Sequence, residues 1–470
     1  MKNRFPACAV SIALAIFTLR VGAAPDADFG SAEPFKAGDT VCYVGDSITH
    51  GGTYHSIVTL FYATRFPDRP IRYWNCGISG DRAGGIMSDE AFRLNIDILG
   101  HKPTVATIML GMNDVGRNDY GEGKSGPEFE QRRQASLDSY DANMQKLIAA
   151  LQKSGARVIL ITPSIYDETT KLEKANPDIG AGRNGALGKC AEKILGWSKQ
   201  YHTGLVKFWE VMKSINEREQ ARDPAFTIVG ADRVHPGAVG HFVMAYTLLK
   251  AQGMPREVAR IAIDARQGKA GEAVNCQIDG VKTAAGGVEF DCLETALPFV
   301  VPDEARAALS LVPFVEDLDQ EPLRVTGLTD GSYNLKIDDQ AVGKFTAADL
   351  QKGINLATIS KTPQYQQSAA ATKINADRTR AAGTLRTIAA QYYGLSRAKV
   401  DVTDRAAVDK KLHEQFEAAK AAGKPIDPRS EALFNDPTEP AKSEKHYMEL
   451  SAALAKACEP RKHHFSISKE

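Results

Sequence analysis

Short apolar runs alternate with longer amphipathic stretches between Thr40 and about Gly253. The amphipathic stretches place apolar residues three and four positions apart, as in SLDSYDANMQKLIAALQKSG (136–155), and this spacing predicts helices. The apolar runs lack the alternation of a half-exposed strand, so we expect strands buried on both faces of a parallel sheet. The predicted strands are TVCYVG (40–45), IRYWNC (71–76), TVATIML (104–110), ARVILIT (156–162) and GLVKF (204–208). This part of the chain is therefore predicted to be an α/β domain.

The pattern changes after Gly253. Residues 270–358 consist of short strand-like runs separated by glycine turns, and YNLKID (333–338) alternates apolar and polar positions. From about Pro363 the chain becomes rich in Ala, Lys and Glu at helical spacing. We therefore predict a small β-rich module over 254–362, followed by a helical arm and C-terminal tail over 363–470.

The predicted arm is expected to be an antiparallel helical appendage that packs on the rest of the chain. A lid over a substrate site is the alternative interpretation. His463 and His464 lie near the C-terminus and are expected to belong to the tail.

The first residues have the pattern of an export signal. Lys2 and Arg4 precede a mostly apolar run, Ala7–Leu19, which is followed by small residues. We expect a signal peptide over 1–23, cut after Ala23, followed by the α/β domain over 24–253, and a mature protein in the periplasm or outside the cell. The apolar run is too short for a spanning helix, and no stable membrane insertion is expected after the signal is removed. The alternative is that the run stays attached after export and acts as a membrane anchor.

The composition indicates the class of protein and which partners are not expected. Of the 470 residues, 43% are hydrophobic and 25% are charged, which is typical of a soluble globular protein with more than one domain. The formal net charge is zero, so the sequence gives no reason to expect a nucleic acid as partner.

Six cysteines follow the predicted signal, and an even number permits disulfides in an oxidising compartment. Cys276 and Cys292 flank a turn-rich segment and are the best local candidate for a bridge. Cys42 and Cys76 lie on apolar runs and are expected to be buried thiols.

Ser47 stands directly after the first predicted strand, in VCYVGDSITHGG (41–52). A serine at this point lies where a helix begins, so backbone N–H groups face it. It is either an ordinary helix N-cap or a residue held there for chemistry. Residues elsewhere in the chain decide between the capping and the chemical interpretation of Ser47.

Three further segments carry polar side chains after later strands. NCGISGDRAGG (75–85) contains Gly80, LGMNDVG (110–116) contains Asn113, and GADRVHPGAVGH (230–241) contains Asp232 and His235. The carboxyl ends of parallel strands meet at one edge of the sheet, where ligands bind. A nucleophile, a base, a carboxylate that orients the base and oxyanion donors are therefore predicted to meet there.

The blocks GDSIT, GISGD, GMND and DRVHP, in this order, resemble those of the SGNH or GDSL-type esterase and lipase superfamily over about residues 40–250. The resemblance implies a flavodoxin-like three-layer α/β/α fold with a five-stranded parallel sheet. It also implies hydrolysis of an ester through an acyl-enzyme. No cofactor belongs to that chemistry.

The same resemblance assigns roles to individual residues. Ser47 is the expected nucleophile, His235 the general base, and Asp232 the carboxylate that orients the imidazole. The N–H groups of Ser47 and Gly80, with the Asn113 side chain, are the expected oxyanion hole.

Other candidate motifs are weaker. GEGKSG (121–126) has Asn118 where a phosphate loop begins with glycine, and neither H-E-x-x-H nor an EF-hand pattern occurs, so no metal is expected. His50 and His55 are expected to be solvated residues near the pocket mouth, and His241 a packing or capping residue.

These observations predict a secreted serine esterase that acts on short O-acyl esters. An O-acetyl group on a carbohydrate is the expected substrate, and this preference follows from the family resemblance. A non-catalytic carbohydrate-binding or structural surface protein, and an acyltransferase that uses the same residues, are the alternatives.

Overall fold

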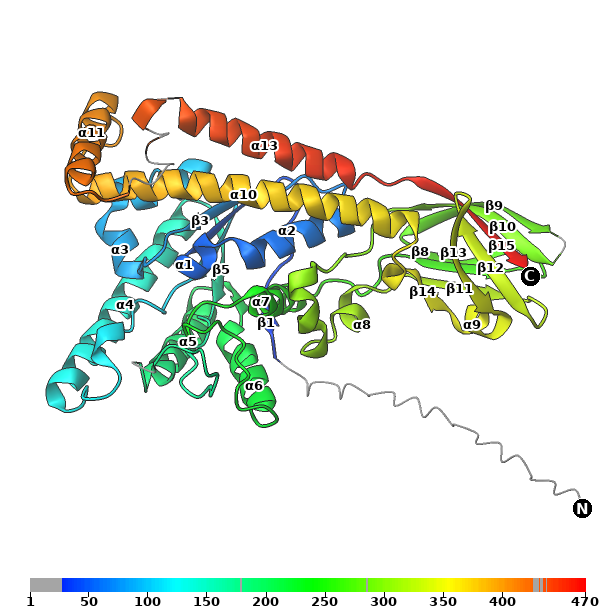
Figure 1. Ribbon diagram of the computed structural model, residues 1–470, viewed down its shortest axis with the longest axis horizontal. Coiled ribbons are helices and arrows are strands. Elements are labelled where there is room, and N and C mark those ends of the chain that lie inside the picture. Colours follow the sequence, from blue (N-terminus) through cyan, green and yellow to red (C-terminus); the bar gives the residue numbers. More distant parts are fainter. Residues whose placement is uncertain (1–27, 178–179, 285, 426–430, 432–433, 437) are drawn as a thin grey trace, which may run out of the picture.

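The computed structural model describes residues 28–470 apart from 178–179, 285, 426–430, 432–433 and 437. The predicted export signal, residues 1–23, lies outside the described residues. Figure 1 shows α/β layers at one end of the molecule, β sheets at the other, and a long helix, α10 (Pro363–Arg397), that runs along both.

A six-stranded sheet in the order β1-β6-β5-β4-β2-β3 forms the centre of the α/β part. Its five parallel strands are those predicted: β2 (Thr40–Gly45), β3 (Arg72–Gly77), β4 (Val105–Met109), β5 (Arg157–Ile161) and β6 (Gly204–Val206). The short strand β1 (Gly30–Ser31) adds antiparallel to β6. In chain order the parallel strands run 2-1-3-4-5, which confirms the flavodoxin-like topology.

Both faces of this sheet are covered, because successive side chains of a strand point to opposite sides. Val41 and Tyr43 of β2 belong to one apolar core, and Cys42 and Val44 to the other. The first core is covered by α2 (Thr53–Arg65), α6 (Phe208–Gln220) and α7 (Ala238–Ala251). The second is covered by α3 (Ala83–Ser88), α4 (Pro127–Lys153) and α5 (Arg183–Gln200).

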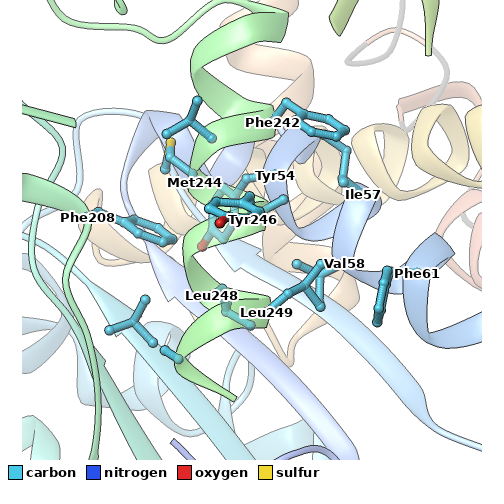
Figure 2. Close-up of a cluster of buried hydrophobic side chains, with 14 of the residues drawn as sticks. Tyr54, Ile57, Val58, Phe61, Phe208, Phe242, Met244, Tyr246, Leu248 and Leu249 are labelled. Carbon is cyan, nitrogen blue, oxygen red and sulfur yellow. The ribbon is translucent and has the colours of Figure 1, made fainter. Parts of the chain in front are cut away.

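Figure 2 shows the first core where α2 and α7 meet. Phe61 and Phe242 from these helices are completely buried. Residues beyond Gly253 complete the cluster: Phe314, the first residue of α8 (Phe314–Leu318), lies 4.9 Å from Phe242 between ring centroids, and Phe299 lies 5.2 Å from Phe314. The α/β core therefore depends on a later part of the chain.

The β module consists of a five-stranded sheet, β13-β12-β15-β10-β9, and a four-stranded sheet, β14-β11-β7-β8. Its strands are β7 (Arg260–Asp264), β8 (Lys269–Val274), β9 (Cys276–Ala284), β10 (Gly287–Glu294), β11 (Pro322–Thr326), β12 (Ser332–Ile337), β13 (Gln340–Thr346), β14 (Ile354–Asn355) and β15 (Lys462–Lys469). Helix α9 (Ala347–Lys352) joins β13 to β14. One apolar core includes residues of both sheets.

The expectation that His463 and His464 belong to a tail is wrong. Both lie in β15, which pairs with β10 on one side and β12 on the other (Figure 1). The buried residues of β15 alternate with more exposed ones, and the Phe465 ring stacks on Phe290 at 4.8 Å. The alternation is present in the sequence, but the strand's partners lie more than a hundred residues earlier.

The arm contains α10, α11 (Arg405–Ala421) and α13 (Glu439–Ala457), and α13 runs antiparallel along α10 (Figure 1). Together they cover β3, the edge strand of the central sheet. The Tyr447 hydroxyl donates to the backbone carbonyl of Tyr73 in β3, and Arg378 donates to the Tyr447 hydroxyl. Covering an edge strand removes a template for pairing with another chain.

All six described cysteines are free thiols. Cys42 and Cys76 are buried, as predicted, while the thiols of Cys276 and Cys292 lie within hydrogen-bonding reach without forming the bridge that the sequence suggested. Over the described ranges, no helix is both long enough and apolar enough to span a bilayer.

Candidate active site

Ser47 is the first residue of α1 (Ser47–His50), a short helix at the carboxyl end of β2. The side chain that caps this helix is Asp46, whose Oδ1 accepts from the Ile48 N–H at 3.0 Å. The Ser47 hydroxyl instead lies 2.7 Å from Nε2 of His235. The geometry therefore favours the chemical interpretation of Ser47 over the capping one.

His235 and Asp232 lie in the loop before α7. The imidazole Nδ1 is 2.6 Å from Asp232 Oδ2, while Asp232 Oδ1 accepts from the backbone N–H groups of Val234 and His235 at 3.0 and 2.9 Å. A carboxylate only accepts hydrogen bonds, so Nδ1 carries the hydrogen and Nε2 is left to accept from the Ser47 hydroxyl. Ser47, His235 and Asp232 thus form a continuous hydrogen-bonded chain.

Arg233, between these two residues, fixes the loop. Its backbone has φ of +67°, and its buried guanidinium donates to the carbonyls of Asn176 at 2.7 Å and Asp167 at 2.9 Å. Sequence reasoning did not single out Arg233. An arginine between two predicted catalytic residues was the available signal, but its partners lie on a distant loop.

The Gly80 and Asn113 loops are tied to the Ser47 loop and to each other. The Ile78 N–H donates to the Gly45 carbonyl at 3.0 Å, and the Asn113 amide donates to the Asp81 carbonyl at 3.1 Å. Gly80 has φ of +79°, a left-handed conformation that favours glycine. The four predicted blocks are therefore adjacent, while the roles of Gly80 and Asn113 as oxyanion donors stay predictions.

Burial sets the electrostatics of this edge of the sheet. It raises the pKa of Asp46 to about 6 and that of Asp114 to about 7. For Asp232, burial also acts to raise the pKa, but hydrogen bonds from the His235 side chain and backbone lower it overall. Asp232 is therefore held ionised, as a partner of an imidazolium must be.

Of the other histidines near Ser47, His50 and His55 are less exposed than the sequence predicted. His55 is not solvated: it is buried and stacks on Tyr43 at 4.5 Å, and burial lowers its pKa to about 3. His50 is half-buried, and its Nδ1 accepts from the Ser79 N–H at 3.1 Å. His241 packs in the interior against Tyr54, as predicted. The error for His55 arises because α2, the helix that carries it, is buried along most of its length.

A buried ion-pair network lies behind the Gly80 loop, and no motif in the sequence indicates it. Arg93 donates to Asp81 at 2.8 Å and to Asp97 at 2.5 Å. Arg386 of α10 donates to both oxygens of Asp97 at 2.8 and 2.9 Å, and to the Gly77 carbonyl at 3.2 Å. The arm is thereby fixed to the loop that carries Gly80.

Within the described part of the chain, no group of three or more His, Cys, Asp or Glu side chains is arranged to hold a metal ion. The side chains at the site are a hydroxyl, an imidazole and hydrogen-bond donors, which are groups able to act as nucleophile, base and oxyanion donors.

The chain is similar to a known protein family and to known proteins. The model of the GDSL-like Lipase/Acylhydrolase family matches residues 43–242. A curated acetylxylan esterase from Geobacillus stearothermophilus is 25% identical over 232 residues, which are 46% of this chain and 95% of that protein.

The likeness to one solved structure extends over nearly the whole chain. The gut microbial diltiazem-metabolizing enzyme BT4096 is 32% identical, with a TM-score of 0.83, and the match covers 94% of this chain and all of that one. The β module and the arm therefore recur together with the α/β part. The chain belongs to the GDSL-like lipase/acylhydrolase family of the SGNH hydrolase superfamily, and it is an ester hydrolase.

Proposed function

We propose that this ester hydrolase removes short acyl groups, O-acetyl above all, from carbohydrate through an acyl-enzyme. The observation that carries the proposal is the chain of hydrogen bonds from Ser47 to His235, 2.7 Å, and from His235 to Asp232, 2.6 Å. The similarity to an acetylxylan esterase supports acetylated carbohydrate as the substrate class. The predicted export signal supports action outside the cytoplasm, where such glycans are met.

In the first half of the reaction, Nε2 of His235 accepts the Ser47 proton as Oγ attacks the acyl carbon. The N–H groups of Ser47 and Gly80 and the Asn113 amide stabilise the oxyanion that forms. His235 then gives its proton to the leaving alcohol as the ester C–O bond breaks, and the acyl group stays on Ser47.

In the second half, His235 takes a proton from water as the water oxygen attacks the acyl-enzyme. His235 then gives this proton to Ser47 Oγ as the bond between Oγ and the acyl carbon breaks, so the acid is released and the Ser47 hydroxyl is restored. The side chains of His235 and Asp232 are 48% and 42% exposed, so the site is open to water and to substituents of a bulky substrate.

The test is Ser47→Ala, assayed with p-nitrophenyl acetate and by acetate release from acetylated xylo-oligosaccharides. We expect turnover to fall on the order of 10⁶-fold, with an unchanged melting temperature. Ser154→Ala, an exposed serine at the end of α4, is the matched control.

Turnover that persists in Ser47→Ala would contradict the mechanism. Hydrolysis of p-nitrophenyl acetate without release of acetate from the oligosaccharides would contradict the substrate class. Acetyl groups found on a sugar acceptor, in place of free acetate, would identify acyl transfer.

A further inference from the structure

A cavity of about 800 Å³ begins at Gly80 and extends between α3, α4 and the last turns of α10. Its volume lies in the range of about 300–1,000 Å³ that is usual for sites that bind small molecules. A Cβ atom on Gly80 would meet no atom within 4 Å, so this residue borders open space. The loop with the predicted oxyanion donor thus opens directly into the cavity, which we call the arm groove.

One wall of the arm groove comes from the C-terminal arm. Tyr393, Gly394 and Arg397 of α10 line it. The Tyr393 hydroxyl donates to Asp81 at 3.4 Å, and the Ser396 hydroxyl donates to Asp89 at 2.8 Å. These contacts, with the Arg386–Asp97 ion pair further along the helix, hold the wall in place against the Gly80 loop.

The charges that line the arm groove do not cancel. Asp81 is paired with buried Arg93, and burial raises the pKa of Asp114 to about 7, so neither carboxyl contributes a full free negative charge. Arg82 and Arg397 are exposed, and across the described ranges neither guanidinium forms an ion pair. The groove therefore presents two exposed guanidinium groups beside the proposed catalytic edge, and that of Arg397 lies over the Tyr393 ring at 5.7 Å.

The second unusual feature is Asp114 itself. Its exposed fraction is 8%, and it lines the groove. Of its two carboxyl oxygens, only Oδ1 forms a hydrogen bond, which it accepts from the Ala83 N–H at 2.8 Å. Oδ2 has no hydrogen-bond partner among the described residues. A buried polar atom left without a partner is costly, and protonation, which burial favours by raising the pKa of Asp114 to about 7, reduces that cost by removing the charge.

From these observations, and resting on the proposed function, we infer that the arm groove binds the alcohol part of the ester, an oligosaccharide that carries a carboxylate. A guanidinium matches a carboxylate with two parallel hydrogen bonds, so Arg397 and Arg82 are suited to a uronic acid unit. Ser136, Ser139 and Asn143 line the groove and provide polar atoms for sugar hydroxyls. The arm is then part of the substrate site and selects acidic over neutral acetylated glycans.

The test measures binding without turnover, in the full-length Ser47→Ala protein. The ligands are an acetylated oligosaccharide with a uronic acid unit and the methyl ester of the same compound, titrated by calorimetry. We expect the acid to bind about tenfold or more tightly than its methyl ester, since a charge-assisted hydrogen bond is lost in the ester.

Arg397→Gln should remove this difference. Arg380→Gln, on the same helix but exposed and paired with Asp377, should leave it unchanged. Equal binding of the acid and its methyl ester, or an unchanged difference in Arg397→Gln, would overturn the inference.

A second pair of variants tests the groove by shape. A Cβ on Gly394 or on Gly383, both in α10, would meet no atom within 4 Å, so each position accepts a larger side chain. Gly394→Phe should fill the groove and weaken binding of both ligands, whereas Gly383→Phe, outside the groove, should not. Undiminished binding in Gly394→Phe would overturn the inference. Because hydrolysis is measured separately in the unmodified protein, a failure of the proposed function is distinguishable from a failure of this one.

Discussion

The α/β part and the C-terminal arm serve the site in different ways. In the α/β part, the site residues lie in short blocks after β2, β3 and β4 and before α7, and the fold brings these blocks to one edge of the parallel sheet. In the arm, the relevant residues belong to no block and act through partners about 300 positions away, as Arg386 does with Asp97. The helix α10 carries no motif, but its hydrogen bonds join it to the Gly80 loop as closely as the motif segments are joined to one another.

The largest effect is expected from removal of everything after Gly253. Phe299 and Phe314 would be lost from the core around Phe61 and Phe242, and each buried side chain of this size contributes about 1.5–3 kcal/mol. We expect a fragment that aggregates and shows no cooperative melting by circular dichroism. A soluble 24–253 fragment with the activity of the full-length chain would mean that the two parts are independent.

Arg386→Met tests the arm by one contact. It leaves Asp97, which is almost fully buried, with Arg93 as its remaining ion-pair partner, and breaking a buried pair costs about 3–5 kcal/mol. We expect a loss of this size in the free energy of unfolding from urea titration, and a lower kcat in the folded fraction because the Gly77 carbonyl loses its donor. Arg380→Met, on the same helix and exposed, should change neither the free energy of unfolding nor kcat. Equal effects of the two variants would contradict the prediction that the Arg386 contact stabilises the site.

Asn113→Ala tests the α/β part. Loss of one oxyanion donor lowers kcat by about 10²–10³, while KM should change little because the donor acts on the transition state. Steady-state kinetics with p-nitrophenyl acetate check this. The melting temperature serves as the control, since the Asn113 amide also donates to the Asp81 carbonyl. An equal rise in KM with unchanged kcat would assign Asn113 to substrate binding instead.

The smallest effect concerns a buried carboxyl pair where the β module meets α10. Burial, and then Glu294, raise the pKa of Glu321 well above its usual range, and Gln364 of α10 donates to Glu294 at 3.2 Å. A carboxyl with a raised folded pKa stabilises the fold at pH below the ordinary pKa of Glu, and this contribution is lost as pH rises through the folded pKa.

Glu321→Gln should therefore flatten the decline of stability toward alkaline pH, by up to about 1.4 kcal/mol for each pH unit between the ordinary pKa of Glu and the raised pKa of the native carboxyl. Melting temperatures from pH 5 to pH 9 measure it. Glu304→Gln, an exposed carboxyl, is the control; parallel curves for Glu321→Gln and the unmodified protein would contradict the prediction.

The sequence predicted the five parallel strands and the meeting of Ser47, Asp232 and His235, because both follow from local patterns. Apolar runs without alternation require burial on two faces, and parallel strands end at a common edge. His55 was misjudged because a histidine gives no local sign of whether its helix is buried along most of its length. β15 was missed because a single strand shows its pairing only through partners distant in the chain.

What the sequence predicted by itself is therefore the candidate chemistry: side chains suited to act as a nucleophile, a base and its carboxylate, placed by blocks whose spacing fits one sheet. Only the tertiary structure decided that Asp46 and not Ser47 caps α1, that Arg233 anchors the histidine loop, and that α10 is fixed beside Gly80. The reason is physical. Periodicity and turn residues act over a few positions, whereas a buried ion pair such as Arg386–Asp97 requires two segments 289 residues apart to leave water together.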